Sequence, residues 1–361
     1  MKIAVVGFND MISMPYMRFY KQLFEKNHIV ADYYCWNREN NAPVEKKADN
    51  VITINLKCKA TNPIAKIGKM LKWKSIILPI LKKEKYDKII MFTSLPAVLL
   101  NRYLIKQKRN NYIFDIRDIT YEKNPVFQRI VQALIRNSFT TFVSSPGFRK
   151  MLLPDRKILN IHNMDTVLAQ YNAPDLNKPT ITIGYIGLIT YTKSSIKLIE
   201  ALNHDRFHFV FCGIYQNAAL QNYCEQNLCK NVQLLGRFDS SEKSDLYAKI
   251  DFVNCYYGEE MNLGRELAFA NRFYDALYYK RPILIARESI MSKYVDEYKL
   301  GIVIDKNTNI EQAIENYILN YNAVEFEANA YALRLILEQE QKAAIESILN
   351  FATATKAITN Q

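Results

Sequence analysis

The chain has 361 residues, 49% of them hydrophobic, which favours two packed cores over a single one. Its formal net charge of +12 is uneven: residues 1–165 carry 29 Lys and Arg against 13 Asp and Glu, and residues 166–361 carry 19 against 23. We therefore expect an anionic partner for the first half. No apolar run is long enough to predict a transmembrane helix, and the opening MKIAVVGFND indicates a buried strand rather than a signal peptide.

Short β-branched runs alternate with helical patterns through the first half. Helices are expected over residues 14–27, 96–107 and 126–137. The strands are expected over residues 2–8, 28–34, 88–94, 111–117, 140–145 and 157–163. This alternation predicts a doubly wound parallel sheet.

A basic amphipathic segment over residues 62–85 stands apart from this alternation. Seven lysines surround a set of apolar residues that has Trp73 near its middle. One interpretation is an interfacial membrane helix, since Lys attracts anionic headgroups while apolar side chains enter the boundary. The other is an ordinary helix that packs on the sheet and keeps a solvated basic face.

The polar segment 166–180 contains two prolines and no periodicity, so we interpret it as a linker. Helical patterns then resume at 195–203, 216–228, 241–249 and 266–279, and residues 311–350 are expected to form terminal helices. The strands of the second half are expected at 180–187, 208–214, 231–238, 251–257, 281–286 and 301–305. The sequence predicts two doubly wound Rossmann-like domains: residues 1–165, a linker over 166–180, residues 181–335, and a C-terminal helix and tail over 336–361.

Metal and nucleic-acid functions have little support in the sequence. The six cysteines form no Cys-x-x-Cys pair, and free thiols explain them better than disulfides or zinc. Only four histidines are present, so no metal site is expected. The aromatic residues lie in expected core strands rather than along a basic groove, which argues against a nucleic-acid partner.

The most informative segment is NRFYDALYYKRPILIA, residues 271–286. It places Asp275 on a short helix before a buried strand, near the edge of the sheet where nucleotides bind in α/β folds. An ionised Asp there offers two oxygens to a ribose diol. The alternative is a surface helix followed by an edge strand.

Taken together, these features resemble the GT-B fold glycosyltransferases, and most of all glycosyltransferase family 4, whose members are retaining and use nucleotide sugars. Residues 271–286 resemble the family segment PNKLFEYMAAGKPVI, and IGYIGLITYTKSSIKLIEAL (183–202) resembles the first strand and glycine turn of its nucleotide domain. FDIRDITYE (114–122) is similar to a run in the branch that builds surface polysaccharides. Further resemblances are FCGIY (211–215), LLGRF (234–238) and HNMD (162–165).

The resemblance implies a donor site without a metal or cofactor, in which Asp275 binds the ribose and Lys193, at a helix start, binds the diphosphate. Relatives carry an Arg shortly before that Lys, but here Leu188, Ile189 and Thr190 occupy the place, so Arg265 or Arg272 would supply the second cation. The expected donor-binding residues are Gly187, Lys193, Gly213, Arg237, Asn271, Arg272 and Asp275.

Three residues are expected to act in catalysis: Asp118, Lys193 and Glu266. Glu266 stands one position away from the first acid of the family's glutamate pair, and it is alternatively a helix-terminal Glu stabilised by the helix dipole. Gly7, Arg117 and Asp118 are expected to meet the acceptor. Arg117 and Asp118 alternatively form a structural ion pair.

The expected reaction moves a sugar from a nucleoside-diphosphate sugar to a hydroxyl of the acceptor, with retention. The basic first domain and residues 62–85 favour a lipid-linked saccharide acceptor at the inner face of the cytoplasmic membrane, as in capsule, O-antigen or exopolysaccharide assembly. Two alternatives stay open: a non-catalytic GT-B protein that binds nucleotide or acts as a scaffold, and a GT-B nucleotide-sugar 2-epimerase.

Overall fold

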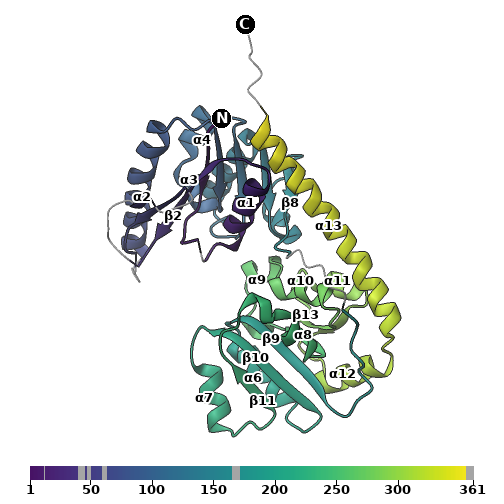
Figure 1. The fold of residues 1–361 in the computed structure, drawn as a ribbon. Helices are drawn as coiled ribbons and strands as arrows, with labels where there is room; N and C mark the ends of the chain where they lie inside the picture. Colours follow the sequence, from purple (N-terminus) through teal and green to yellow (C-terminus); the bar gives the residue numbers. More distant parts are fainter. Residues whose placement is uncertain (12, 40–44, 47–49, 59–62, 165–170, 355–361) are drawn as a thin grey trace. The chain divides into compact units, whose positions relative to one another are not determined.

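The computed structural model describes residues 1–11, 13–39, 45–46, 50–58, 63–164 and 171–354. The chain forms two compact units, each with its own sheet (Figure 1). The first unit comprises Met1–His162 and Glu340–Gln361, and the second comprises Asn163–Gln339. Part of the expected linker, residues 166–170, lies outside the described residues. Its remainder packs on the second unit, where Leu176 is buried in the core.

The first unit is built on an eight-stranded sheet with the order β3-β4-β2-β1-β5-β6-β7-β8, in which only β3 is antiparallel to its neighbour. Its strands are β1 (Ile3–Val6), β2 (Ala31–Asn37), β3 (Glu45–Lys46), β4 (Val51–Asn55), β5 (Lys88–Phe92), β6 (Tyr112–Ile116), β7 (Thr140–Val143) and β8 (Ile158–Asn160). Its helices are α1 (Pro15–Lys26), α2 (Pro63–Lys83), α3 (Ser94–Leu99), α4 (Asn101–Gln107), α5 (Pro125–Asn137) and the 3-10 helix η1 (Pro146–Met151).

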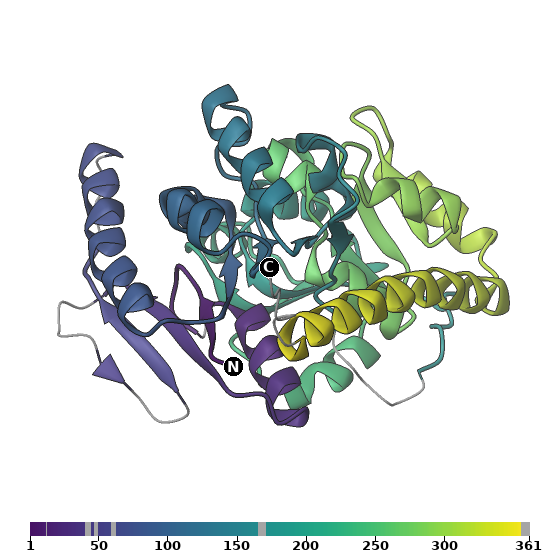
Figure 2. The ribbon, with the colours of Figure 1, turned by 90° about the horizontal axis from the view of Figure 1, so that it is seen from above.

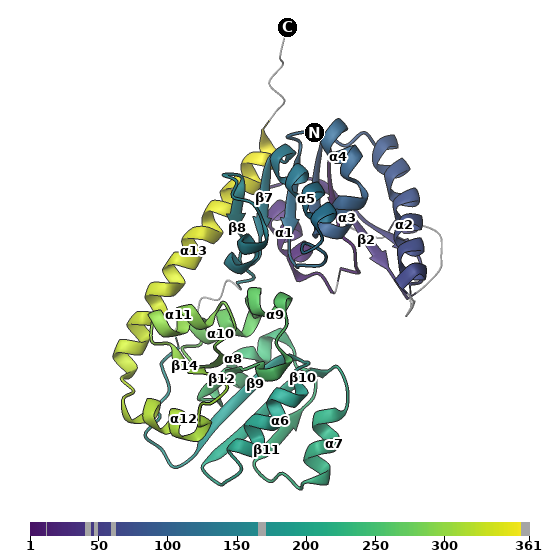
Figure 3. The ribbon, with the colours of Figure 1, turned by 180° about the vertical axis from the view of Figure 1, so that it is seen from behind.

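Helices cover both faces of this sheet, as the alternating pattern predicts. Figure 3 shows α3, α4 and α5 on one face and α1 behind the sheet. The core on the α1 side contains Met17 and Tyr20 together with Ile348 and Phe351 from the end of the long helix α13 (Ala323–Thr353). The first unit therefore completes its core with residues from the far end of the chain.

The second unit has a six-stranded parallel sheet with the order β11-β10-β9-β12-β13-β14. Its strands are β9 (Ile181–Ile189), β10 (Phe207–Tyr215), β11 (Val232–Leu235), β12 (Phe252–Cys255), β13 (Ile283–Ala286) and β14 (Gly301–Ile304). Its helices are α6 (Thr192–Ala201), α7 (Ala219–Gln226), η2 (Ser240–Glu242), α8 (Lys243–Ala248), η3 (Gly258–Glu260), α9 (Leu263–Leu267), α10 (Asn271–Tyr278), α11 (Ser292–Glu297), α12 (Ile310–Leu319) and the first part of α13. The fold class is α/β with two doubly wound sheets, as predicted.

The single helix expected over residues 266–279 is instead two helices, α9 and α10. Between them Ala268 adopts an extended conformation, and Phe269 packs edge-on against Phe273 and Tyr294. Because Phe269 is buried in this ring cluster, the chain leaves the helix there and restarts at Asn271. The restart places Arg272 in the first turn of α10.

Helix α2 packs against the first sheet through one face, at the edge that carries β4 (Figure 2). Trp73, Ile77 and Leu81 on this face are fully buried, and the Trp73 ring meets Phe8 edge-on at 4.8 Å. Trp73 is therefore a core residue, which corrects the interpretation that places it at a membrane boundary. The opposite face exposes lysines together with Ile67 and Leu71.

All six cysteines are free thiols, as expected, and Cys35, Cys212, Cys224 and Cys255 are buried. Within the described residues, no cluster of His, Cys, Asp and Glu has the composition of a metal site. None of the helices among them is long and apolar enough to cross a membrane.

Candidate functional site

The strand order of the second sheet reverses between β9 and β12, and ligands of doubly wound sheets bind at the carboxyl ends of such strands. β9 and β12 pair only through Ile183–Phe252 and Gly184–Val253. Beyond that point the side chain of Arg272 reaches in from α10 and stacks on the Tyr185 ring, with 3.5 Å between the guanidinium carbon and the ring centroid. Its Nε donates to the Asn254 carbonyl at 3.0 Å. Arg272 therefore places a guanidinium at the strand reversal.

Arg272 carries a buried charge without a counter-ion. It is only 7% exposed, and none of the described carboxylates forms an ion pair with it. Its other hydrogen bond goes to the neutral Tyr257 hydroxyl at 3.3 Å. Beside it, Nδ2 of the buried Asn254 has no acceptor among the described residues. A buried charge normally requires a partner, so this arrangement favours an anionic ligand.

Two expected glycines of the donor site lie side by side at this edge of the sheet. Gly187 near the end of β9 has φ +127°, and its register partner Gly213 on β10 has φ +146°. A Cβ on Gly213 would lie 1.8 Å from the Gly187 carbonyl oxygen, so no larger residue fits. The backbone is thus bare next to Arg272, which permits the close approach of a ligand.

The guanidinium of Arg272 belongs to a row of cations and rings that we call the cation–aromatic ladder: Arg265, Tyr191, Tyr257, Arg272 and Tyr185. Arg265 lies 4.5 Å from the Tyr191 ring centroid, and the Tyr191 and Tyr257 centroids are 4.0 Å apart. Arg272 lies 5.8 Å from the Tyr257 ring. The two arginines suggested as replacements for the missing family Arg are therefore connected through two tyrosines, and both lie in the same part of the second unit.

Lys193 lies in the first turn of α6, two residues after Tyr191 of the ladder. Its side chain is exposed and forms no hydrogen bond or ion pair with a described residue. The helix terminus itself is occupied, because the Glu260 carboxylate accepts from the Ser194 amide and hydroxyl, both at 2.9 Å. An anion at this terminus would therefore compete with Glu260 for the helix amides.

Asp275 is 9% exposed and already has partners for both carboxylate oxygens. Lys243 forms an ion pair with Oδ1 at 2.7 Å, and the Tyr247 hydroxyl donates to Oδ2 at 3.0 Å. Burial raises the pKa of Tyr247, and the Asp275 charge raises it further, so the phenol stays a donor. The sequence suggested that both carboxylate oxygens of Asp275 are free for a ribose diol. In the structure a diol would have to share these oxygens with Lys243 and Tyr247.

Three further expected residues occupy different surroundings in the second unit. Asn271 begins α10 and is exposed, and Arg237 is exposed in the loop after β11. Glu266, near the end of α9, is half-buried. None of the three side chains has a partner among the described residues.

In the first unit, Arg117, one of the three residues expected to meet the acceptor, belongs to a buried polar network. Arg117 makes a bidentate ion pair with the buried Asp115, at 2.6 Å from Nε to Oδ1 and 2.7 Å from Nη2 to Oδ2. Tyr20 donates to the same carboxylate at 2.9 Å, and burial followed by the Asp115 charge raises its pKa. The ion pair is structural, as one alternative held, but its acid is Asp115 instead of Asp118. Arg117 is therefore not available to an acceptor.

Asp118 is exposed after the carboxyl end of β6 and accepts a hydrogen bond from the Ile119 amide at 3.1 Å. Desolvation by the surrounding chain and the charge of Glu122 raise its pKa, opposed by that hydrogen bond. Gly7, after β1, has no room for a side chain, since a Cβ would lie 2.5 Å from the Met14 methyl group. Its backbone amide bonds to the Tyr34 carbonyl, so Gly7 acts in packing.

Solved structures with the same architecture identify the fold. Sucrose-phosphate synthase from Thermosynechococcus elongatus matches 96% of this chain and 99% of its own, with a TM-score of 0.69 and 14% identity. HepE from Anabaena, solved with UDP-glucose, matches 97% and 100% with a TM-score of 0.65 and 16% identity. The chain has the GT-B fold.

A third structure, the lipopolysaccharide outer core galactosyltransferase WaaB, matches 97% of this chain and 99% of its own, with a TM-score of 0.65 and 11% identity. No family model and no curated protein matches the sequence. At these identities the GT-B likeness is one of fold, and the chemistry has to be argued from the residues of the site.

Sequence reasoning missed Glu260 at the α6 terminus and the tyrosines of the ladder. Ser194 and Glu260 are 66 positions apart, and Arg272 and Tyr185 are 87 apart, so no local spacing links them. The available signal was the tyrosine content of 24 residues, several of them at strand ends in the second half.

Proposed function

We propose that the protein is a glycosyltransferase that moves a sugar from a nucleoside-diphosphate sugar to an acceptor hydroxyl. The observation that carries the proposal is the buried, unpaired guanidinium of Arg272 at the strand reversal of a GT-B second unit. HepE, which has the same fold, was solved with UDP and UDP-glucose. A diphosphate supplies the negative charge that Arg272 lacks.

In this proposal the cations act on the leaving group. The bond between the anomeric carbon and the diphosphate oxygen breaks, and the bond to the acceptor oxygen forms. The acceptor's proton passes to a phosphate oxygen of the donor. Arg265, Arg272 and Lys193 stabilise the charge that develops on the diphosphate, which is the largest electrostatic demand of the reaction without a metal.

The remaining donor contacts follow from the same placement. Gly187 and Gly213 leave the backbone open to the diphosphate, and Asp275 meets the ribose by sharing its oxygens with Lys243 and Tyr247. Arg237 and Asn271 are exposed and have no described partner, so both are available to the donor. Glu266 is the candidate group at the sugar, and Asp118 at the acceptor.

The finer part of the proposal is retention of configuration and a lipid-linked saccharide acceptor, as in capsule, O-antigen or exopolysaccharide assembly. The outer face of α2 supports it, because it presents Lys66 and Lys72 with Ile67 and Leu71 to solvent. Lysines near an anionic leaflet contribute about 1 kcal/mol each. The protein would then work at the inner face of the cytoplasmic membrane.

The test is a thermal-shift screen of the full chain against UDP, GDP, CDP, ADP and TDP, repeated with Lys193→Ala. A ligand at about 100 times its Kd stabilises the fold by about 2.7 kcal/mol, which raises the melting temperature measurably. We expect one nucleotide to raise it and the variant to lose most of the shift. No shift with any of the five would contradict the proposal.

Transfer itself is tested separately, by following nucleoside diphosphate release from the matching nucleotide sugar with and without a lipid-linked saccharide. Acceptor-dependent release supports a transferase. Binding without release would favour the non-catalytic alternative, and interconversion of free sugars without acceptor would favour the epimerase.

For the membrane part, the variant Lys66→Glu, Lys69→Glu, Lys72→Glu and Lys74→Glu should no longer sediment with anionic vesicles. Equal sedimentation of this variant and the wild type would reject the proposal that the protein binds an anionic membrane through α2.

A further inference from the structure

A cavity of about 310 Å³ lies in the second unit, near the amino-terminal end of β14 and away from the cation–aromatic ladder. Gly301, the first residue of β14, lines it, whereas the ladder lies at the carboxyl ends of the strands. Its walls come from α11, the end of α12 and the start of α13. The lining residues are Val295, Asp296, Lys299, Gly301, Tyr317, Asn320, Tyr321, Asn322, Glu325, Phe326 and Asn329. The volume is within the range of small-molecule sites, about 300–1,000 Å³.

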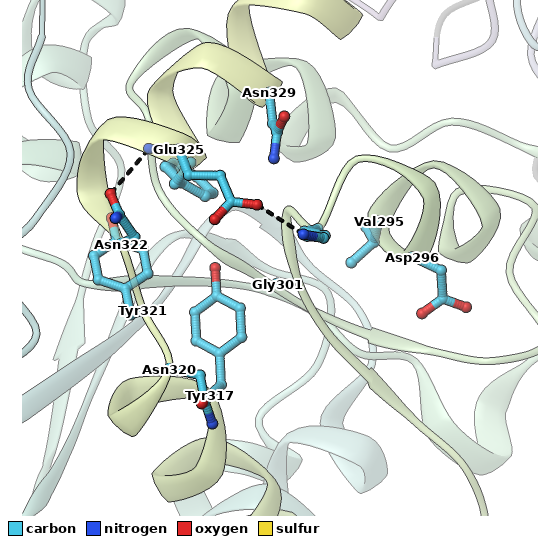
Figure 4. Close-up of a pocket in the computed structure, with 11 residues that line it drawn as sticks. Val295, Asp296, Gly301, Tyr317, Asn320, Tyr321, Asn322, Glu325 and Asn329 are labelled. Carbon is cyan, nitrogen blue, oxygen red and sulfur yellow. Dashed lines mark hydrogen bonds and ion pairs between the residues drawn. The ribbon is translucent and has the colours of Figure 1, made fainter.

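The cavity combines ring faces with side-chain amides. Figure 4 shows Asn329 and Glu325 on α13 facing Val295 and Asp296 of α11 across the cavity. Asn329 is half-buried, and its amide has no partner among the described residues. The Asn329 amide therefore leaves donors and an acceptor open beside the rings of Tyr317 and Phe326.

The charges that line the cavity exclude an anionic ligand. The one cation in the lining, Lys299, is 2.7 Å from the Glu325 carboxylate. Asp296 adds a further negative charge and pairs with Arg287 outside the cavity. A phosphate or carboxylate would therefore meet no available cation, in contrast to the surroundings of Arg272.

The ligand that fits these groups is neutral and rich in hydroxyls. An amide both donates and accepts, as a hydroxyl does, and a tyrosine ring offers an apolar face with a polar edge. A pyranose has hydroxyls around its rim and C–H groups on its faces, which matches both features. An aliphatic ligand would leave the amides unsatisfied.

We propose that this cavity binds a neutral saccharide, at a site separate from the one where sugar transfer is proposed. The Lys299–Glu325 ion pair bridges α13 and the turn before β14, with side chains 72% and 52% exposed. Exposed pairs of this kind contribute little to stability, so a ligand can displace this one at small cost. The site would hold a saccharide chain away from the reacting end.

The experiment is saturation-transfer NMR on the full chain with maltose, cellobiose and lactose as probes, and glucose 6-phosphate as the anionic counterpart. We expect at least one neutral disaccharide to bind and glucose 6-phosphate not to bind at this site. Asn329→Ala should lower the affinity for the disaccharide by about three- to tenfold, which corresponds to the loss of one or two neutral hydrogen bonds. Asn316→Ala is the matched control, since Asn316 is on α12 but does not line the cavity.

Tyr317→Ala should lower the affinity for the disaccharide more than Asn329→Ala does. Because Tyr317 also packs on Phe252, Tyr317→Ala can misfold, and Asn329→Ala is then the variant that tests the proposal. Lys193→Ala should leave disaccharide binding unchanged. Failure of all three disaccharides to bind the wild type would overturn the proposal. So would equal binding by the wild type and Asn329→Ala, or loss of binding in Lys193→Ala.

Discussion

Each unit of this protein holds a buried arginine near the carboxyl ends of its strands, and the two arginines differ in whether a carboxylate pairs with them. Arg117 in the first unit has a bidentate carboxylate, Asp115, and lies 5.0 Å from the Tyr16 ring. Arg272 in the second unit lies 3.5 Å from the Tyr185 ring and has no described carboxylate. The same residue type at the same edge of a doubly wound sheet therefore serves structure in the first unit, whereas in the second we propose that it binds a ligand.

The difference teaches that position in the fold does not assign a role to a charged residue. What assigns it is whether the chain supplies the counter-ion. A buried cation with its own carboxylate is satisfied, whereas one held only by rings and neutral oxygens gains most from an anion that arrives from outside.

The largest expected effect breaks the satisfied pair. Asp115→Ala leaves the guanidinium of Arg117 buried without its carboxylate, which should lower the free energy of unfolding by about 3–5 kcal/mol, measured by urea denaturation. The double variant Asp115→Leu, Arg117→Met should recover most of the loss because it removes both charges. If the single variant unfolds like the wild type, the ion pair is not structural.

Arg272→Met tests the unpaired arginine with the opposite expectation. Stability without ligand should change by less than about 1 kcal/mol, since the lost hydrogen bonds are offset by removal of an uncompensated charge. Affinity for the nucleoside diphosphate should fall roughly 10- to 100-fold, as for loss of charged hydrogen bonds, measured by calorimetry.

The control for Arg272→Met is Arg287→Met, which removes an exposed arginine paired with Asp296 and Asp305 in the same unit. It should leave nucleotide affinity unchanged. A large loss of stability in Arg272→Met with unchanged nucleotide affinity would contradict this prediction. It would mean that Arg272, like Arg117, serves structure.

Glu260→Gln should strengthen nucleotide binding. The Gln side-chain oxygen can still accept hydrogen bonds from Ser194, but the negative charge that repels a phosphate at the start of α6 is removed. We expect an affinity gain of about two- to fivefold, the scale of a single charge at a helix terminus. Glu288→Gln, also an acid of the second unit but exposed, is the control. A weaker affinity in Glu260→Gln would place this carboxylate in contact with the donor itself.

The smallest expected effect concerns Asp118, whose pKa is raised in the folded state. A raised carboxyl pKa means that the protonated form favours folding, so this contribution is present below the unfolded pKa of about 3.9 and is lost as the pH rises through the raised value. Asp118→Asn should therefore be slightly more stable than the wild type at neutral pH. Melting temperatures measured from pH 3 upward check this, and a difference independent of pH would contradict it.

The fold was largely predictable because alternation of β-branched runs and helical patterns is a local signal. Residues 88–94 and 111–117 contain β5 and β6, and the predicted second-half strands contain or overlap β9–β14. The strand β4 was missed, since VITIN is a short run between polar segments. The break between α9 and α10 was missed because it depends on burial of Phe269 among distant rings.

The candidate site was predictable only in outline. The sequence pointed to Lys193, Arg272 and Asp275, but it gave no indication that Asp275 is held by Lys243 and Tyr247. It offered Arg117 either to the acceptor or to an ion pair with Asp118, whereas the carboxylate that pairs with it is Asp115. Partners in three dimensions decide which charges are available, and these partners are not neighbours in sequence.

The long helix α13 has a consequence for how the chain matures. Phe326, Leu333 and Leu337 belong to the core of the second unit, while Ala344, Ile348 and Phe351 belong to that of the first. During synthesis the N-terminal sheet emerges early but lacks these side chains until residue 351 has been made. Until then the apolar surface on the α1 side of the first sheet stays exposed. We expect a chaperone to protect the chain from aggregation mainly during that interval.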